Sequence, residues 1–237
     1  MADYLLMLLE DEQAQEREPP KSTATLIEQQ AEYTDRIRRT GKLKDSGRLR
    51  PSREGQRVRR HGDHVSVQEG PFDEQGRSLG AYLWVQADGI DAAARLAAEC
   101  PTHASDEIDV RPVMKGNIEG DKEGKPGKIF AFGVLGHATT EGAWVEIMNR
   151  IDAESQGRPQ AAGFIGGVRL EAPKSGRRVV SEAGRRAIFD GPFLESKEVI
   201  GGVFLVRMTS MDTAIAWASE SPFVAHGALE IRELWRI

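Results

Sequence analysis

Apolar positions recur along this chain with the spacing of a strand in some stretches and with the spacing of a helix in others. These stretches follow one another in the same order in both halves of the chain. The unbroken apolar run Tyr4–Leu9 predicts a buried strand, because a strand covered on both faces needs no polar side. The polar stretch 12–20 predicts a loop, and apolar residues at helical spacing then predict a helix from about Thr25 to Gly41. The remaining pattern predicts strands at 43–49, 79–86 and 108–113, a hairpin at 56–69, and a second helix from Ile90 that ends before Pro101.

The second half of the chain repeats this order. It predicts strands at 129–135, 164–170, 200–207 and 229–234, a hairpin around 179–189, and helices over 140–154 and after a capping Ser210. Residues 70–114 align with 191–235 without a gap, and the identical pairs include Gly70/Gly191, Pro71/Pro192, Phe72/Phe193, Gly80/Gly201 and Arg111/Arg232. The sequence therefore predicts two copies of one module, at 1–114 and 128–237, joined by a Gly-rich charged linker at 115–127.

The order of elements within one copy predicts the fold class. Without its inserted hairpin each copy is βαββαβ, the α+β order of a ferredoxin-like sheet with both helices on one face. The other face must bury its apolar residues, and the second copy is the nearest partner. We therefore expect tandem ferredoxin-like modules whose sheets pack face to face inside one chain.

Composition limits the partners and the cellular compartment that we expect for this chain. The chain of 237 residues carries 32 Lys and Arg against 37 Asp and Glu, a net charge of −5 without a long basic run, which argues against a nucleic-acid partner. A single cysteine, Cys100, excludes an intrachain disulfide and fits a reducing cytosol. The apolar run near the start is too short to span a membrane and is followed by acidic residues, so we expect a soluble, cytoplasmic protein with no membrane partner.

Several short motifs together resemble a known family. They are Asp190-Gly191-Pro192-Phe193, the pair Gly201-Gly202, and the segments 100–101 and 110–114 at the ends of the first copy. In this order of elements they resemble the YCII-related family, and within it the DGPF-domain branch, over nearly the whole chain twice. The resemblance implies a dimeric α/β-barrel, formed here as an internal pseudo-dimer. It also implies bacterial cytoplasmic proteins of mostly unassigned function, some of them encoded beside extracytoplasmic-function sigma factors.

The His–Asp pair that is proposed for single-domain members of the family has no counterpart in this sequence. The predicted helix starts near Thr25 and Thr140 hold no histidine, and the positions before the later prolines are Cys100 and Ser221. The first copy also has Glu69 in place of the motif's aspartate.

Histidines in two loops are the candidates for catalysis. In a βαββαβ sheet the loop after the first strand and the loop before the fourth open at one end of neighbouring strands, so His137 and His226 are expected to converge there. Such a pair would serve acid–base chemistry, while the alternative is two exposed loop histidines. The first copy offers His103 at the corresponding end, with an acidic residue among 10–12.

Charged residues on or beside strands are the candidates for ligand binding. Arg48 aligns with Arg169 and Arg111 with Arg232, and an arginine facing the space between the sheets would clamp an anion, whereas the alternative is a carboxylate partner or solvent. Asp190 either lines a pocket or belongs to ordinary turn chemistry, in which the following glycine permits positive φ.

No motif specifies a cofactor, a metal or a reaction. Phosphate-loop and C-x-x-C patterns do not occur, and the histidines of the 61–64 hairpin flank a turn. We therefore expect a regulatory or ligand-sensing protein that binds a small polar or anionic molecule. The alternative is a cofactor-independent enzyme that uses histidine acid–base chemistry on a small organic acid.

Overall fold

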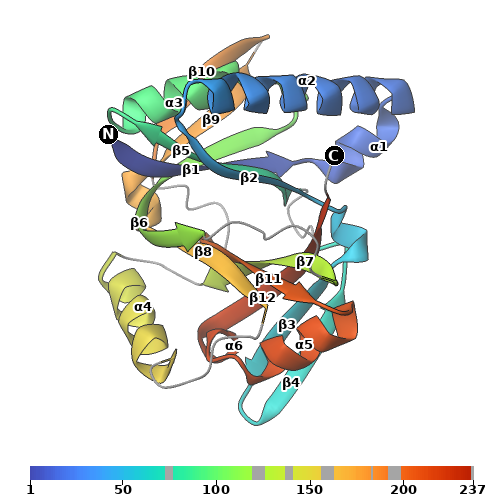
Figure 1. Cartoon of the computed structure of the whole chain (residues 1–237), viewed down its shortest axis with the longest axis vertical. Coiled ribbons are helices and arrows are strands. Elements are labelled where there is room, and N and C mark those ends of the chain that lie inside the picture. The colour runs from blue at the N-terminus through green and yellow to red at the C-terminus, as the bar shows by residue number, and fades with distance from the viewer. Residues whose placement is uncertain are drawn as a thin grey trace.

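The computed structural model describes residues 1–72, 77–118, 126–136, 141–155, 163–182, 184–191 and 199–235 (Figure 1). The first half contains β1 (Ala2–Glu10), α1 (Glu12–Arg17), α2 (Pro20–Arg39), β2 (Leu43–Leu49), η1 (Ser52–Glu54), β3 (Gln56–His61), β4 (His64–Glu69), β5 (Ser78–Ala87), α3 (Ile90–Glu99) and β6 (Glu107–Ile118). The second half contains β7 (Lys128–Gly136), α4 (Glu141–Ser155), β8 (Phe164–Leu170), η2 (Pro173–Ser175), β9 (Arg177–Glu182), β10 (Arg185–Asp190), β11 (Val199–Met208), α5 (Met211–Glu220), α6 (Phe223–His226) and β12 (Gly227–Trp235).

Eight of these strands form a closed antiparallel barrel. Each half contributes a four-stranded sheet, in the order β2-β5-β1-β6 and β8-β11-β7-β12. The two sheets join along two seams of unequal length. At one seam β6 pairs with β8 between Val113 and Ile118, whereas at the other β12 pairs with β2 only at Leu234 and Trp235.

Apolar side chains pack inside the barrel and cover both of its outer faces. Helices α2 and α3 lie over the first sheet, and α5 and α6 lie over the second (Figure 1). Side chains of both halves meet inside the barrel, and the buried ones are Leu5, Met7, Leu49, Leu79, Tyr82, Trp84, Ile129, Ala131, Val168, Leu170, Val203 and Leu205. The predicted mixture of α and β structure, with the two sheets enclosing one interior, is confirmed.

The two hairpins are exchanged between the halves, which the sequence pattern did not predict. Hairpin β3–β4 of the first half pairs with β12, and hairpin β9–β10 of the second half pairs with β6. Ion pairs at equivalent positions hold each hairpin, with 2.8 Å between Arg57 and Glu230 and 2.7 Å between Arg178 and Asp109. Each hairpin also places one fully buried valine in the core of the other half, so the halves interlock as well as pack.

Three local predictions were wrong. The predicted loop at 12–20 contains α1, which the Asp11 side chain caps by accepting from the N–H of Ala14 at 2.8 Å. Helix α2 begins at Pro20, because a proline at the first helical position gives up an N–H that has no partner there. His226 ends the short helix α6, where a loop was expected. In addition, β6 continues to Ile118, four residues into the stretch expected to be linker.

The repeated Gly-Pro element has a structural role, but its physical reason differs from the expected one. Neither Gly70 nor Gly191 has a positive φ. A Cβ on Gly70 would lie 1.8 Å from the carbonyl oxygen of Ser52, and one on Gly191 would lie 2.4 Å from that of Pro173. Glycine is therefore required because the strand end passes directly over a 3-10 turn. Pro192 and Phe193 lie outside the described residues.

Candidate functional site: a cavity at the β2–β12 seam

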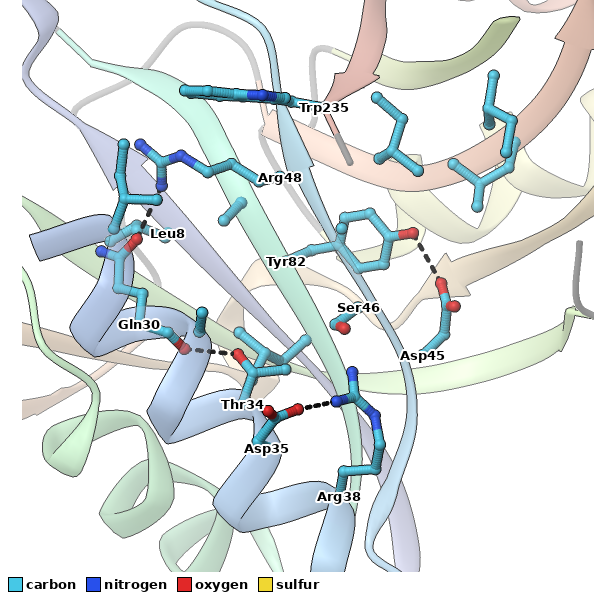
Figure 2. A pocket seen from close by; sticks show the side chains of 18 of the residues that line it. Leu8, Gln30, Thr34, Asp35, Arg38, Asp45, Ser46, Arg48, Tyr82 and Trp235 are labelled. Atoms are coloured by element: carbon cyan, nitrogen blue, oxygen red, sulfur yellow. Dashed lines mark hydrogen bonds and ion pairs between the residues drawn. The ribbon is translucent and has the colours of Figure 1, made fainter. Parts of the chain in front are cut away.

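A cavity of about 460 Å³ lies at the shorter seam of the barrel. Among the described strands, the edge of β2 from Leu43 to Gly47 pairs only with β5, because β12 reaches β2 just at its last two residues. The cavity surrounds this edge, so that α2 and β5 line one part of it and the barrel interior lines the other (Figure 2). Its volume falls within the range of small-molecule sites, about 300–1,000 Å³.

The part beneath α2 is built around Arg48. Its Nη1 donates to Gln30 Oε1 of α2 at 2.8 Å, and its Nη2 donates to Glu10 Oε1 at 2.8 Å. Gln30 in turn donates to the carbonyl oxygen of Pro101 at 2.9 Å, which fixes the amide orientation. The Nε of Arg48 is buried and has no hydrogen-bond partner. The guanidinium is therefore held by protein groups at both Nη atoms, and its buried Nε does not face the open space of the cavity.

The part inside the barrel presents a Tyr–Asp pair against apolar side chains. The Tyr82 hydroxyl donates to Asp45 Oδ2 at 2.7 Å (Figure 2). Burial raises the pKa of the Asp45 carboxyl above its ordinary value of 3.8, against the opposing effect of the bonds from Tyr82 and the Ser46 backbone. Burial likewise raises the pKa of Tyr82 well above its ordinary value. The facing wall is apolar and consists of Ile118, Ile129, Ile165, Leu205 and Leu234.

The raised pKa of Asp45 predicts a pH-dependent effect of Asp45→Asn. Because the folded-state pKa is the higher one, the contribution of Asp45 to stability is fully present below 3.8 and is lost as the pH rises through its folded-state pKa. Asparagine cannot ionise and keeps an acceptor for Tyr82. We expect Asp45→Asn to unfold at higher urea than the wild type at about pH 7, and at the same urea at about pH 3. Asp63→Asn, on the exposed hairpin turn, is the control and is expected to show no such pH-dependent gain.

Cys100 also lines the cavity, but its thiol is not activated. It occupies the position before proline, is 5% exposed, and burial raises its pKa to about 12 despite nearby Arg186 and Arg48. At about pH 8 the thiolate fraction is then on the order of one in ten thousand. We expect iodoacetamide to modify Cys100 only after the protein unfolds, which mass spectrometry with and without urea would show. Rapid alkylation of the folded protein would contradict this.

Of the four predicted ligand-binding arginines, Arg48 lines the cavity. Arg232 is 1% exposed and is held by protein groups, with its Nε 2.7 Å from the Arg50 carbonyl and its Nη1 3.0 Å from Glu230. Arg111 is equally buried, donates to the Glu171 carbonyl, and lies 5.5 Å from the centre of the Trp144 ring. Arg169 lies on β8 and does not line this cavity.

The other predicted residues are spread over the molecule. Asp190 ends β10 with an 82% exposed side chain that pairs with Arg177 at 2.9 Å. His103 lines a separate open cleft beside α2, and its backbone N–H donates to Asp106 at 2.9 Å. His226 does not line the cavity, and His137 lies outside the described residues, so their convergence stays a prediction.

Sequence reasoning missed Asp45, Tyr82 and Gln30. Asp45 and Tyr82 lie on strands of the barrel wall, and only the pairing of Asp45 with Trp84 in the β2–β5 register brings Asp45 next to Tyr82. Gln30 lies on α2 and reaches Arg48 only once the helix packs on the sheet. No local motif marks these residues. In the described part of the chain, no group of three or more His, Cys, Asp or Glu residues is placed to hold a metal ion.

The structure therefore defines an α/β-barrel protein made of two similar halves, with a cavity where they meet. The family model of the YCII-related domain matches residues 3–117 and 141–237, and the chain belongs to that family with two copies of its domain in tandem. No curated protein matches the chain. A solved structure described as an anthrone oxidase-like protein has a TM-score of 0.41 and 12% identity, over 99% of this chain and 92% of that one, which carries no functional argument. No helix among the described residues is both long and apolar enough to cross a membrane.

Proposed function

We propose that this protein binds a small organic molecule in the cavity at the β2–β12 seam. The observation that carries the proposal is the cavity of about 460 Å³ itself, in which the Tyr82–Asp45 hydrogen bond lies against apolar side chains from both halves. Preformed apolar walls with few polar groups are typical of ligand sites.

A thermal-shift screen with small organic molecules tests the proposal, because a ligand that binds only the folded state raises its stability. Ala81→Phe places a ring in the cavity from β5, and Ala225→Phe places the same ring on the exposed surface of α6. We expect compounds that raise the melting temperature of the wild type and of Ala225→Phe, and that leave Ala81→Phe unchanged. A screen without such compounds would refute the proposal.

The wider assignment is part of the same proposal. We place the protein in the cytoplasm, in the DGPF-domain branch, and in regulation linked to an extracytoplasmic-function sigma factor, on the strength of the motif resemblance. We assign modules at 1–114 and 128–237 of ferredoxin-like type, which the strand order of each half supports. The alternative of histidine acid–base catalysis by His137 and His226 stays a proposal, because His137 lies outside the described residues.

A further inference from the structure

The Tyr82–Asp45 pair in the inner part of the cavity points to the class of ligand, and this inference rests on the proposed function. We infer that the ligand is a protonated organic amine with an apolar body. Its ammonium group pairs with the carboxylate of Asp45, and its body lies against the barrel interior. The anion that the arginine pattern alone suggests would instead meet a carboxylate there.

Asp45 and the apolar wall of the cavity lie on the same face of the sheet. In the β2–β5 register Asp45 lies opposite Trp84, and Gly47 lies opposite Tyr82. Both aromatic residues belong to the barrel interior, together with the apolar residues that line the cavity, which are Ile118, Ile129, Ile165, Leu205 and Leu234. Asp45 itself lines the cavity and is only partly buried. A molecule in this part of the cavity therefore contacts both the carboxyl group and the apolar wall.

Asp45 is also the charged residue of the lining that has no counter-ion among the described residues. The other charged residues of the lining form ion pairs, which are Arg38–Asp35 and Arg48–Glu10. Lys44 precedes Asp45 in the chain, but its Nζ lies 2.6 Å from Asp3 and it does not line the cavity. We therefore expect the ligand to bring the positive charge that this carboxylate lacks.

An ammonium group suits the Asp45 carboxyl better than a neutral or an anionic group does. Burial raises the pKa of Asp45, which means that its surroundings do not compensate the negative charge. A carboxylate has about four acceptor positions, and the bonds from Tyr82 and from the Ser46 backbone leave others for a ligand (Figure 2). A cation at hydrogen-bond distance offsets the cost of burial, whereas an alcohol adds a hydrogen bond alone and an anion is repelled.

The apolar wall determines the other part of the ligand. Its residues come from β6 of the first half and from four strands of the second half. Apolar surface that is removed from water stabilises binding in proportion to its area, so the wall favours a hydrocarbon or aromatic body. The cavity volume of about 460 Å³ lies in the range that holds a two-ring aromatic body with a short amine-bearing arm.

Three naphthalene probes that differ in one group test the inference by isothermal titration calorimetry at neutral pH. They are 2-(aminomethyl)naphthalene, which is protonated at this pH, the neutral 2-(hydroxymethyl)naphthalene and the anion 2-naphthoate. We expect the amine to bind the wild type about tenfold more tightly than the alcohol, because only the amine supplies a counter-charge to Asp45. The naphthoate should bind more weakly than either.

Asp45→Asn tests the role of the charge, because asparagine keeps an acceptor for Tyr82 but cannot ionise. The amine should bind this variant about tenfold more weakly than it binds the wild type, so that its advantage over the alcohol disappears. Asp63→Asn makes the same change of net charge on the exposed hairpin turn and should leave the affinity for the amine unchanged. Since Asp45→Asn is expected to be more stable than the wild type at neutral pH, unfolding does not account for a loss of binding.

Two tryptophan variants on β8 locate the bound amine. Ile165 lines the cavity from the barrel interior, whereas the neighbouring Phe164 is 38% exposed and stacks on Phe204 outside the barrel. Ile165→Trp fills the cavity and should abolish binding of the amine. Phe164→Trp should leave the binding unchanged. Circular dichroism and melting temperatures check that both variants are folded.

The outcomes distinguish this inference from the proposed function. Equal affinities for the amine and the alcohol, or an amine affinity that Asp45→Asn does not lower, would overturn the amine class. If Ile165→Trp still blocked binding in that case, the cavity would stand as a ligand site. Failure of the amine to bind, or binding that Ile165→Trp does not affect, would also overturn the inference. The proposed function itself fails only if the wider thermal-shift screen finds no compound.

Discussion

Replacing Arg232 with methionine is expected to lower the free energy of unfolding by about 3 kcal/mol, because removing one partner of a buried ion pair leaves charges uncompensated. Its guanidinium lies 3.0 Å from Glu230 and 3.5 Å from Glu12, and it donates to the carbonyl of Arg50. The loss is at the lower end of the usual range since Arg57 still faces Glu230 at 2.8 Å. Urea unfolding at neutral pH, followed by circular dichroism, measures it.

The internal repeat supplies a matched control in Arg111→Met. Arg111 occupies the equivalent strand position and is equally buried, but its guanidinium forms no ion pair with the described residues, and burial lowers its pKa to about 10. Methionine there removes a poorly compensated buried charge together with one hydrogen bond to Glu171 and the contact with Trp144. We expect a loss of at most about 1 kcal/mol. Equal losses for the two variants would show that the ion pairs of Arg232 do not carry its effect.

Gly70→Ala is expected to destabilise the fold by about 3 kcal/mol, the upper end of the usual cost of overpacking. The added Cβ would lie 1.8 Å from the carbonyl oxygen of Ser52. This oxygen belongs to the backbone, so no flexible side chain can move aside to relieve the contact. Either the 3-10 turn or the end of β4 has to shift. Gly191→Ala meets the carbonyl of Pro173 in the same way and should have a similar effect. Thermal and urea unfolding of both variants measure it.

Gly62→Ala separates steric contact from backbone conformation. Gly62 has a φ of 61° in the turn of the β3–β4 hairpin, and nothing lies within 4 Å of a Cβ built on it. Only the conformational cost of a left-handed alanine remains, about 1 kcal/mol. A loss at Gly62 as large as that at Gly70 would contradict the steric explanation of the repeated Gly-Pro element.

Part of the candidate site was predictable from the sequence. The alignment of the two copies singled out Arg48 as an arginine that could face the space between the sheets, whereas the structure places it beneath α2, where it lines the cavity beside Gln30 and Glu10. The same reasoning singled out Arg111 and Arg232, which the structure places among protein partners. The position of an arginine along its strand cannot separate these cases, because Glu10 and the carbonyls of Glu171 and Arg50 come from other parts of the chain.

The sequence by itself determined the repeat, the element order and the mixture of helix and strand, because these follow from local periodicity and from identities such as Gly70 with Gly191. Only the tertiary structure decided which strands meet. The exchange of hairpins and the short β2–β12 seam depend on pairings between residues far apart in the chain, such as Arg57 with Glu230 and Arg48 with Trp235. No local pattern encodes such pairings, and the cavity exists because of them.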